Sequence, residues 1–97
     1  MHTLKGEWSS NRIWLDGKEL LPDRSLEVIN HSPDGFFWGY DGSGPSQLAL
    51  AITLELTNSY LDYQDFKHNF IAKLPQKDFE RSFNLPTEDK YYAEAYK

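Results

Sequence analysis

The chain contains no cysteine, only one methionine and no long apolar run. Without cysteine, disulfides, thiolate zinc sites, iron–sulfur clusters and cysteine nucleophiles are excluded. The longest nearly apolar stretch, residues 48–56, is interrupted by Thr53 and Glu55 and is too short to span a bilayer. The first residues also lack the apolar core of a signal peptide. These features predict a soluble, cytoplasmic protein that does not insert into membranes.

Basic residues are in the minority. Ten Lys and Arg face fifteen Asp and Glu, which gives a net charge of −5. Direct binding of nucleic acid through its phosphates needs a basic surface, so the charge argues against it. The acids are scattered and form no dense run, which makes imitation of DNA a weak alternative. The histidines at positions 2, 31 and 68 lack metal-ligand spacing, so we expect no metal and no cofactor.

Aromatic residues, by contrast, are abundant at 15% of a chain of 97 residues. A chain of this length forms one domain, residues 1–97, and buries roughly two-thirds of its unfolded surface. Asp16-Gly17, between short runs at 13–15 and 18–21, has the chemistry of a tight hairpin turn. Further strands are predicted at residues 4–8, 26–29 and 36–40, the last covered on both faces because its aromatics are consecutive.

Helices are predicted in the second half of the chain. Pro45 opens a helix to residue 57 that is apolar on most of its circumference and should be buried. Ser59 and Asp62 resemble a capping box for a second helix, residues 59–74, whose Lys67 should point outward. An edge strand at 79–85 and a short helix capped by Thr87 complete the chain. The pattern predicts an α+β fold in which a small antiparallel sheet with an N-terminal hairpin is packed by two main helices and a short C-terminal helix.

The most informative segment is the aromatic and glycine-rich run at residues 36–47. A glycine turn followed by a helix places unpaired backbone N–H groups at a helix N-terminus, where an anion is favoured. The spacing from Gly39 to Gly44 is that of a phosphate-binding P-loop, but Pro45 replaces its lysine, so ATP hydrolysis is not expected. A tight structural turn explains the same glycines equally well.

Nine residues form the predicted ligand site. Some belong to the glycine-rich turn itself, and the others lie beside it at the rim of the site. Two neighbours in the preceding turn would supply hydrogen bonds, and two aromatics would stack on a base or sugar unless they belong to the core. The nine are His31, Ser32, Trp38, Tyr40, Gly42, Ser43, Gly44, Ser46 and Gln47. No catalytic residue is predicted, because Asp41 and Pro45 stand where a Gly-x-Ser-x-Gly nucleophile elbow requires glycine.

Residues 20–25, 30–36, 38–51, 63–67 and 74–75 together resemble a small uncharacterised family found in bacteria and their phages. The central motif runs Trp-Gly-Tyr-x-Gly-Ser-Gly-Pro-x-Gln-Leu-Ala-Leu-Ala from Trp38. The resemblance implies a phage or mobile-element setting and supports the position of the site. It implies no activity, because none is established for that family.

Two main hypotheses for function follow. The first is a non-enzymatic protein that binds a phosphate-containing small ligand, such as a nucleotide-type host immune signal, at the glycine-rich turn. The alternative is an inhibitor of a host defence protein that acts through an acidic or aromatic surface. A binder should line a concave, partly apolar pocket with the motif, whereas an inhibitor should display a flat patch and fill the motif side of its fold with core. A purely structural module and a homo-oligomer also remain open.

Overall fold

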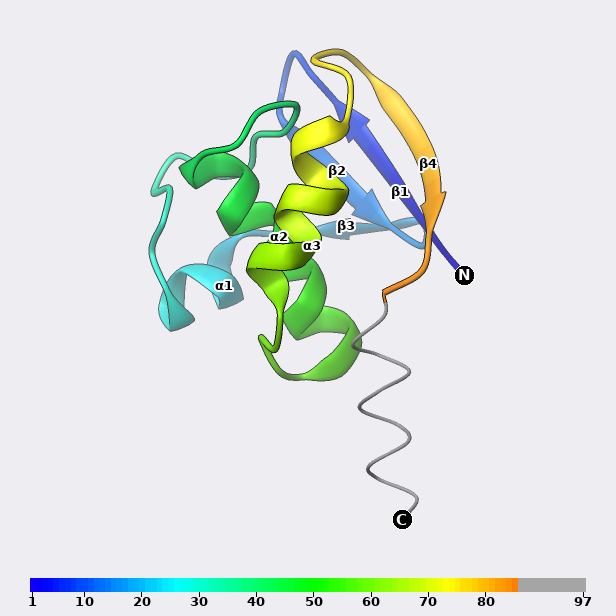
Figure 1. The fold of residues 1–97 in the computed structure, drawn as a ribbon. Coiled ribbons are helices and arrows are strands. Elements are labelled where there is room, and N and C mark those ends of the chain that lie inside the picture. The colour runs from blue at the N-terminus through cyan, green and yellow to red at the C-terminus, as the bar shows by residue number, and fades with distance from the viewer. Residues whose placement is uncertain (86–97) are drawn as a thin grey trace.

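The computed structural model describes residues 1–85, and residues 86–97, with the predicted helix at Thr87, lie outside the described part. Four strands form one antiparallel sheet: β1 (His2–Glu7), β2 (Arg12–Leu15), β3 (Lys18–Leu20) and β4 (Phe79–Phe83). Their order is β3-β2-β1-β4, so the chain returns from its helices to pair with its own first strand. The helices α1 (Asp23–Val28), α2 (Ser43–Thr57) and α3 (Tyr63–Asn69) lie on one side of this sheet (Figure 1). The predicted α+β class is confirmed.

The predicted hairpin is present. Leu15 pairs with Lys18, and the two turn residues Asp16 and Gly17 have φ angles of 51° and 83°. Both values lie in the left-handed region that a tight primed turn requires, and Asp and Gly are among the residues that adopt it most readily. Alternation along β1 and β2 then buries Leu4, Ile13 and Leu15 against the helices.

The predicted buried helix is confirmed as α2, which begins two residues before Pro45 and ends where expected. Leu48, Leu50 and Ile52 are all fully buried, because α2 is covered by the sheet and by the other helices. Asn58 terminates it in the left-handed conformation, with φ of 56°. A helix that is apolar around most of its circumference needs such cover.

Two predicted strands are wrong. Residues 23–28 form α1 instead of a strand at 26–29, because Pro22 and Asp23 start a helix and the Ser25 hydroxyl donates a hydrogen bond to the Pro22 carbonyl at 2.8 Å. Residues 36–40 form no strand. The backbone turns at Gly39, which has a φ of 85°. The Gly39 N–H donates a hydrogen bond at 3.1 Å to the carbonyl of Ile71, a residue outside the sheet.

The second predicted helix is shorter than expected. It is divided into α3 and a 3-10 turn, η1 (Ile71–Lys73). Its N-cap is Asp62, without a side-chain cap bond, while the Ser59 hydroxyl accepts a bond from the N–H of Leu61. The outward orientation predicted for Lys67 is also wrong, because this side chain is buried against Asp41. The predicted edge strand is confirmed as β4, which pairs only with β1 in the described chain.

Candidate functional site

The structure brings the glycine-rich turn to the N-terminus of α2, as the motif predicts. Most of the predicted ligand residues nevertheless face the interior. Trp38, Gly44, Ser46 and Gln47 are buried, and so is Ser32 in the preceding turn. The exposed members are Ser43 and Tyr40, the latter at 41%.

Trp38 is a core residue. Its ring is fully buried and meets the rings of Trp8 and Phe79 edge to face, with centroids 5.3 and 5.2 Å apart. Its indole N–H donates a hydrogen bond to the Pro75 carbonyl at 2.9 Å. Burial of the ring together with a satisfied N–H is the usual state of a structural tryptophan. In this structure its ring is therefore not available to stack on a ligand.

Gln47 joins three segments from the centre of the fold. Its Oε1 accepts hydrogen bonds from the N–H groups of His31 at 2.8 Å and Ser32 at 3.1 Å. Its Nε2 donates to the Ser25 hydroxyl at 2.8 Å and to the Ile29 carbonyl at 3.1 Å. An amide has two donors and two acceptor positions, so all of its capacity is used within the protein. Gln47 thus holds α1 and the turn at residues 29–32 against α2.

The first turn of α2 is covered by aromatic side chains. A Cβ at Gly44 would lie 2.5 Å from Cβ of Phe37, and a Cβ at Gly42 would lie 2.6 Å from Cε2 of Tyr40. The Ser46 N–H already bonds the Gly42 carbonyl at 3.0 Å, and no side chain caps the helix. Glycine at position 44 is therefore required by close packing, in addition to any role of its N–H.

Beside this turn lies a charged cluster that the sequence analysis missed. The Asp41 carboxylate meets Nζ of Lys67 at 2.8 Å and Nδ1 of His68 at 2.7 Å. The hydrogen bond from Lys67 is the main reason that the pKa of Asp41 is lowered, and the charge of His68 adds to it. Lys67 is only 8% exposed, so Asp41 supplies the partner that its buried ammonium group needs. The cluster fastens α3 to the loop before α2.

His31 has a comparable role in joining segments. One ring nitrogen, Nε2, lies 2.8 Å from the Tyr63 hydroxyl, which ties the turn at 30–35 to the start of α3. Its ring is half-buried, and its main chain is held by Gln47. No group of three or more histidines and acids in residues 1–85 is placed to hold a metal.

Three cavities on the described part of the chain lie away from all nine predicted residues. The largest, of about 400 Å³, is a groove between α3 and the C-terminal end of β4, which we call the α3–β4 groove. It is lined by Asp62, Asp65, Phe66, Asn69, Phe70, Phe83, Asn84 and Leu85. The other two, of about 260 and 380 Å³, lie beside β3 and on the open face of the sheet.

The floor of the α3–β4 groove is aromatic. Phe70 stacks on Phe66 and on Phe83, with ring centroids 5.5 and 5.1 Å apart, and Phe66 and Phe83 are themselves 5.5 Å apart. Phe66 and Phe83 are buried, whereas Phe70 is half-buried and forms the accessible part of the floor. Three packed rings leave little rotamer freedom to lose when a further apolar group is added.

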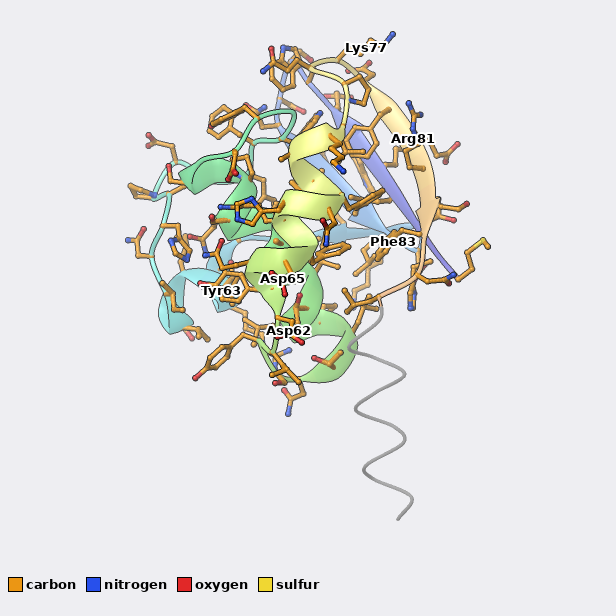
Figure 2. The ribbon with its side chains drawn as sticks, viewed as in Figure 1. Asp62, Tyr63, Asp65, Lys77, Arg81 and Phe83 are labelled. Atoms are coloured by element: carbon orange, nitrogen blue, oxygen red, sulfur yellow. The ribbon has the colours of Figure 1, made fainter. Side chains whose placement is uncertain are left out.

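The rim of the groove is acidic. Figure 2 shows Asp62 and Asp65 at the start of α3 and Phe83 across from them on β4, while Lys77 and Arg81 lie toward the opposite end of that strand. Both aspartates are exposed, and within residues 1–85 neither carboxylate has a cationic group within 4.0 Å. The groove therefore combines an apolar floor with unneutralised negative charge.

Residues 4–91 match the model of DUF6166, described as a family of unknown function. The chain belongs to this family. The match spans most of the chain, so the predicted membership of an uncharacterised family is confirmed, and DUF6166 brings no activity with it. Neither the curated proteins nor the solved structures contain a significant match.

The sequence offered a partial signal for the α3–β4 groove. Phe66 and Phe70 are four residues apart, the spacing that places two side chains on one face of a helix, and Asp62 and Asp65 come shortly before them in the sequence. What the sequence does not show is that the end of β4 lies opposite this helix, because that depends on the pairing of β4 with β1. The pocket is therefore a product of tertiary structure.

Proposed function

We propose that this protein is a non-enzymatic interaction module that binds a segment of a partner protein in the α3–β4 groove. The observation that carries the proposal is the contrast between the two regions. The glycines and most side chains of the glycine-rich turn are used for packing, and a concave, partly apolar surface lies at the α3–β4 groove. The packing of the motif into the core is what we expected of an inhibitor rather than of a small-ligand binder, although the α3–β4 groove is concave where we expected an inhibitor to present a flat patch.

The groove also suits a peptide segment better than a reaction. Among residues 1–85, its lining includes no Ser, Thr, Tyr, His or Lys, and the ionisable groups that these residues supply are two exposed carboxylates. It ends at β4, whose outer edge is unpaired in the described chain. An unpaired edge offers main-chain donors and acceptors to an extended segment, and adjacent pockets then select its side chains.

The biological setting is a further part of the proposal. The resemblance to a family of bacteria and phages supports a phage or mobile-element origin, and in that setting we propose a host defence protein as the partner. The lack of cysteine favours a cytoplasmic location. No helix within residues 1–85 is long and apolar enough to cross a membrane.

A random library of twelve-residue peptides, selected on the full-length protein, tests the proposal. The selected peptides are then mapped by the shifts of backbone amide resonances. We expect shifts in α3 and at the end of β4. Asn69→Arg should abolish binding, because it places a cationic side chain in the groove at an exposed position. Asn30→Arg, the same change at an exposed position outside the groove, should bind normally. Peptides that bind elsewhere, or no selected peptides, would contradict the proposal.

As a second function, we propose that the glycine-rich turn binds a small anion. The observation behind it is that Lys67 and His68 both lie beside Asp41, just before the N-terminus of α2. There an anion would compete with the carboxylate of Asp41. Thermal denaturation with phosphate and with mono- and cyclic nucleotides tests it, since a ligand at a hundred times its Kd stabilises a protein by about 2.7 kcal/mol. Asp41→Asn should strengthen such binding. No thermal shift in either protein would exclude this function.

A further inference from the structure

We infer that the segment bound in the α3–β4 groove carries lysine or arginine beside an aromatic or large aliphatic side chain. This inference rests on the proposed function and names the chemistry of the partner. The apolar side chain would pack on Phe70, the accessible ring of the floor, and the cation would approach Asp62 and Asp65 on the rim.

The apolar half of the inference follows from the floor. The stacked rings of Phe66, Phe70 and Phe83 present edges and faces that favour another ring in an offset or edge-to-face contact. A cavity of about 400 Å³ has room for one large side chain with its neighbours. Phe70 is the ring that gains most from being covered, because Phe66 and Phe83 are already buried.

The cationic half follows from charge complementarity. The described residues that line the groove include two carboxylates and no basic side chain. The remaining polar groups of the lining are the amides of Asn69 and Asn84, which are neutral and suited to hydrogen bonds with a peptide main chain. An acidic segment would place like charges together, and the net charge of −5 on the whole protein acts in the same direction. Both the carboxylates of the groove and the net charge of the protein therefore attract a basic segment.

The matched test changes charge without changing shape. Asp62 has a φ angle of 56°, a conformation that asparagine tolerates as well as aspartate does, so Asp62→Asn with Asp65→Asn should preserve the fold. The control is Glu27→Gln with Asp34→Asn, which removes the same charge from exposed positions outside the groove. The probes are the selected peptides and versions in which every Lys and Arg is replaced by Gln.

We expect the selected peptides to be enriched in Lys or Arg next to an apolar anchor. Their Kd should rise about five-fold on the double asparagine protein, since each exposed ion pair contributes modestly, and should hardly change on the control. The Gln versions of the peptides should bind both aspartate and asparagine proteins equally. High salt should weaken binding to the wild-type protein more than to the double asparagine protein.

The outcomes separate the inference from the proposed function. Peptides that map to the groove but lack basic residues, or that ignore the asparagine changes, overturn the inference and leave the function standing. The absence of any groove-binding peptide overturns both. Binding that appears only in a full-length protein with Tyr91→Ser and Tyr92→Ser would identify the chain's own C-terminal residues as the occupant and overturn the assignment to a partner.

Discussion

Replacing Gln47 with leucine tests whether the motif holds the fold together. The side-chain amide of Gln47 is fully buried, and its four hydrogen bonds of 2.8–3.1 Å connect α2 to α1 and to the turn that follows α1. Leucine has a similar volume and the same or better helix propensity, so the helix itself should tolerate it. The change therefore removes the hydrogen bonds with little other disturbance.

The magnitude follows from the groups left without a partner. Ser32 is buried, so its N–H would lose its bond without access to water, whereas the main chain at Ile29 and His31 is only half-buried. A buried polar group left unsatisfied costs about 1–3 kcal/mol, and the half-buried groups cost less because water replaces part of the bond. The Ser25 hydroxyl keeps its bond to Pro22 and adds little. The sum is roughly 3 kcal/mol, a large share of the about 5–15 kcal/mol that stabilises a typical domain.

Urea unfolding followed by tryptophan fluorescence measures this loss, because Trp38 is buried in the core. We expect a lower midpoint with an unchanged slope, and a fall in Tm of roughly 12–24 °C. Gln76→Leu is the matched control, since Gln76 is an exposed glutamine that donates a single bond to the Gly39 carbonyl at 3.2 Å. It should cost less than about 1 kcal/mol. A loss at Gln47 no larger than at Gln76 would refute the reasoning.

Three further changes probe the same region. Gly39→Ala should destabilise the protein by about 1–3 kcal/mol, because residue 39 has a φ of 85° and the new Cβ would lie 2.8 Å from the Leu74 carbonyl oxygen. An unchanged midpoint of urea unfolding would contradict this prediction. The pKa of Asp41 is lowered in the folded protein by its hydrogen bond with Lys67, so the stabilisation from this carboxylate is present above the ordinary aspartate pKa of 3.8 and is lost as the pH falls through the lower folded value. Asp41→Asn should remove this acid-dependent component of stability, and identical pH profiles of stability for the two proteins would exclude it. Trp38→Phe should cost about 2–4 kcal/mol, because the half-buried Pro75 carbonyl loses its donor and the smaller ring leaves a cavity in the core. A loss below about 1 kcal/mol in the same unfolding assay would argue against this reasoning.

The elements that were predicted correctly are those whose signal is local. Asp16-Gly17 requires no information beyond its own two residues to favour a primed turn, and the apolar run from Leu48 to Leu56 has to be buried wherever it lies. The strand predicted at 26–29 is wrong because its own residues do not decide its structure. Its leucine, valine and isoleucine favour a strand, but the start at Pro22 and the bond between Ser25 and Gln47 fix a helix.

The candidate site was harder to predict than the fold. Locally, the glycine-rich turn has the properties of an anion site, and nothing near it in the sequence reveals that Phe37 and Tyr40 cover its glycines or that Lys67 reaches Asp41 from α3. The α3–β4 groove depends on an even longer connection, because Phe83 lies opposite Phe66 only after β4 has paired with β1. Both features are set by tertiary contacts between residues far apart in the sequence.

The burial of α2 explains why these two regions have different roles. This helix is enclosed by the sheet, α1 and α3, so a motif at its N-terminus is surrounded by core and its side chains are used to position the neighbouring segments. By contrast, α3 and β4 lie at the border of the fold, where Phe70 and the two aspartates are not covered by described residues. Changes in the motif should therefore appear first as lost stability. Changes at Asp62 and Asp65 should appear as lost binding with stability nearly unchanged, because exposed carboxylates without ion pairs contribute little to folding.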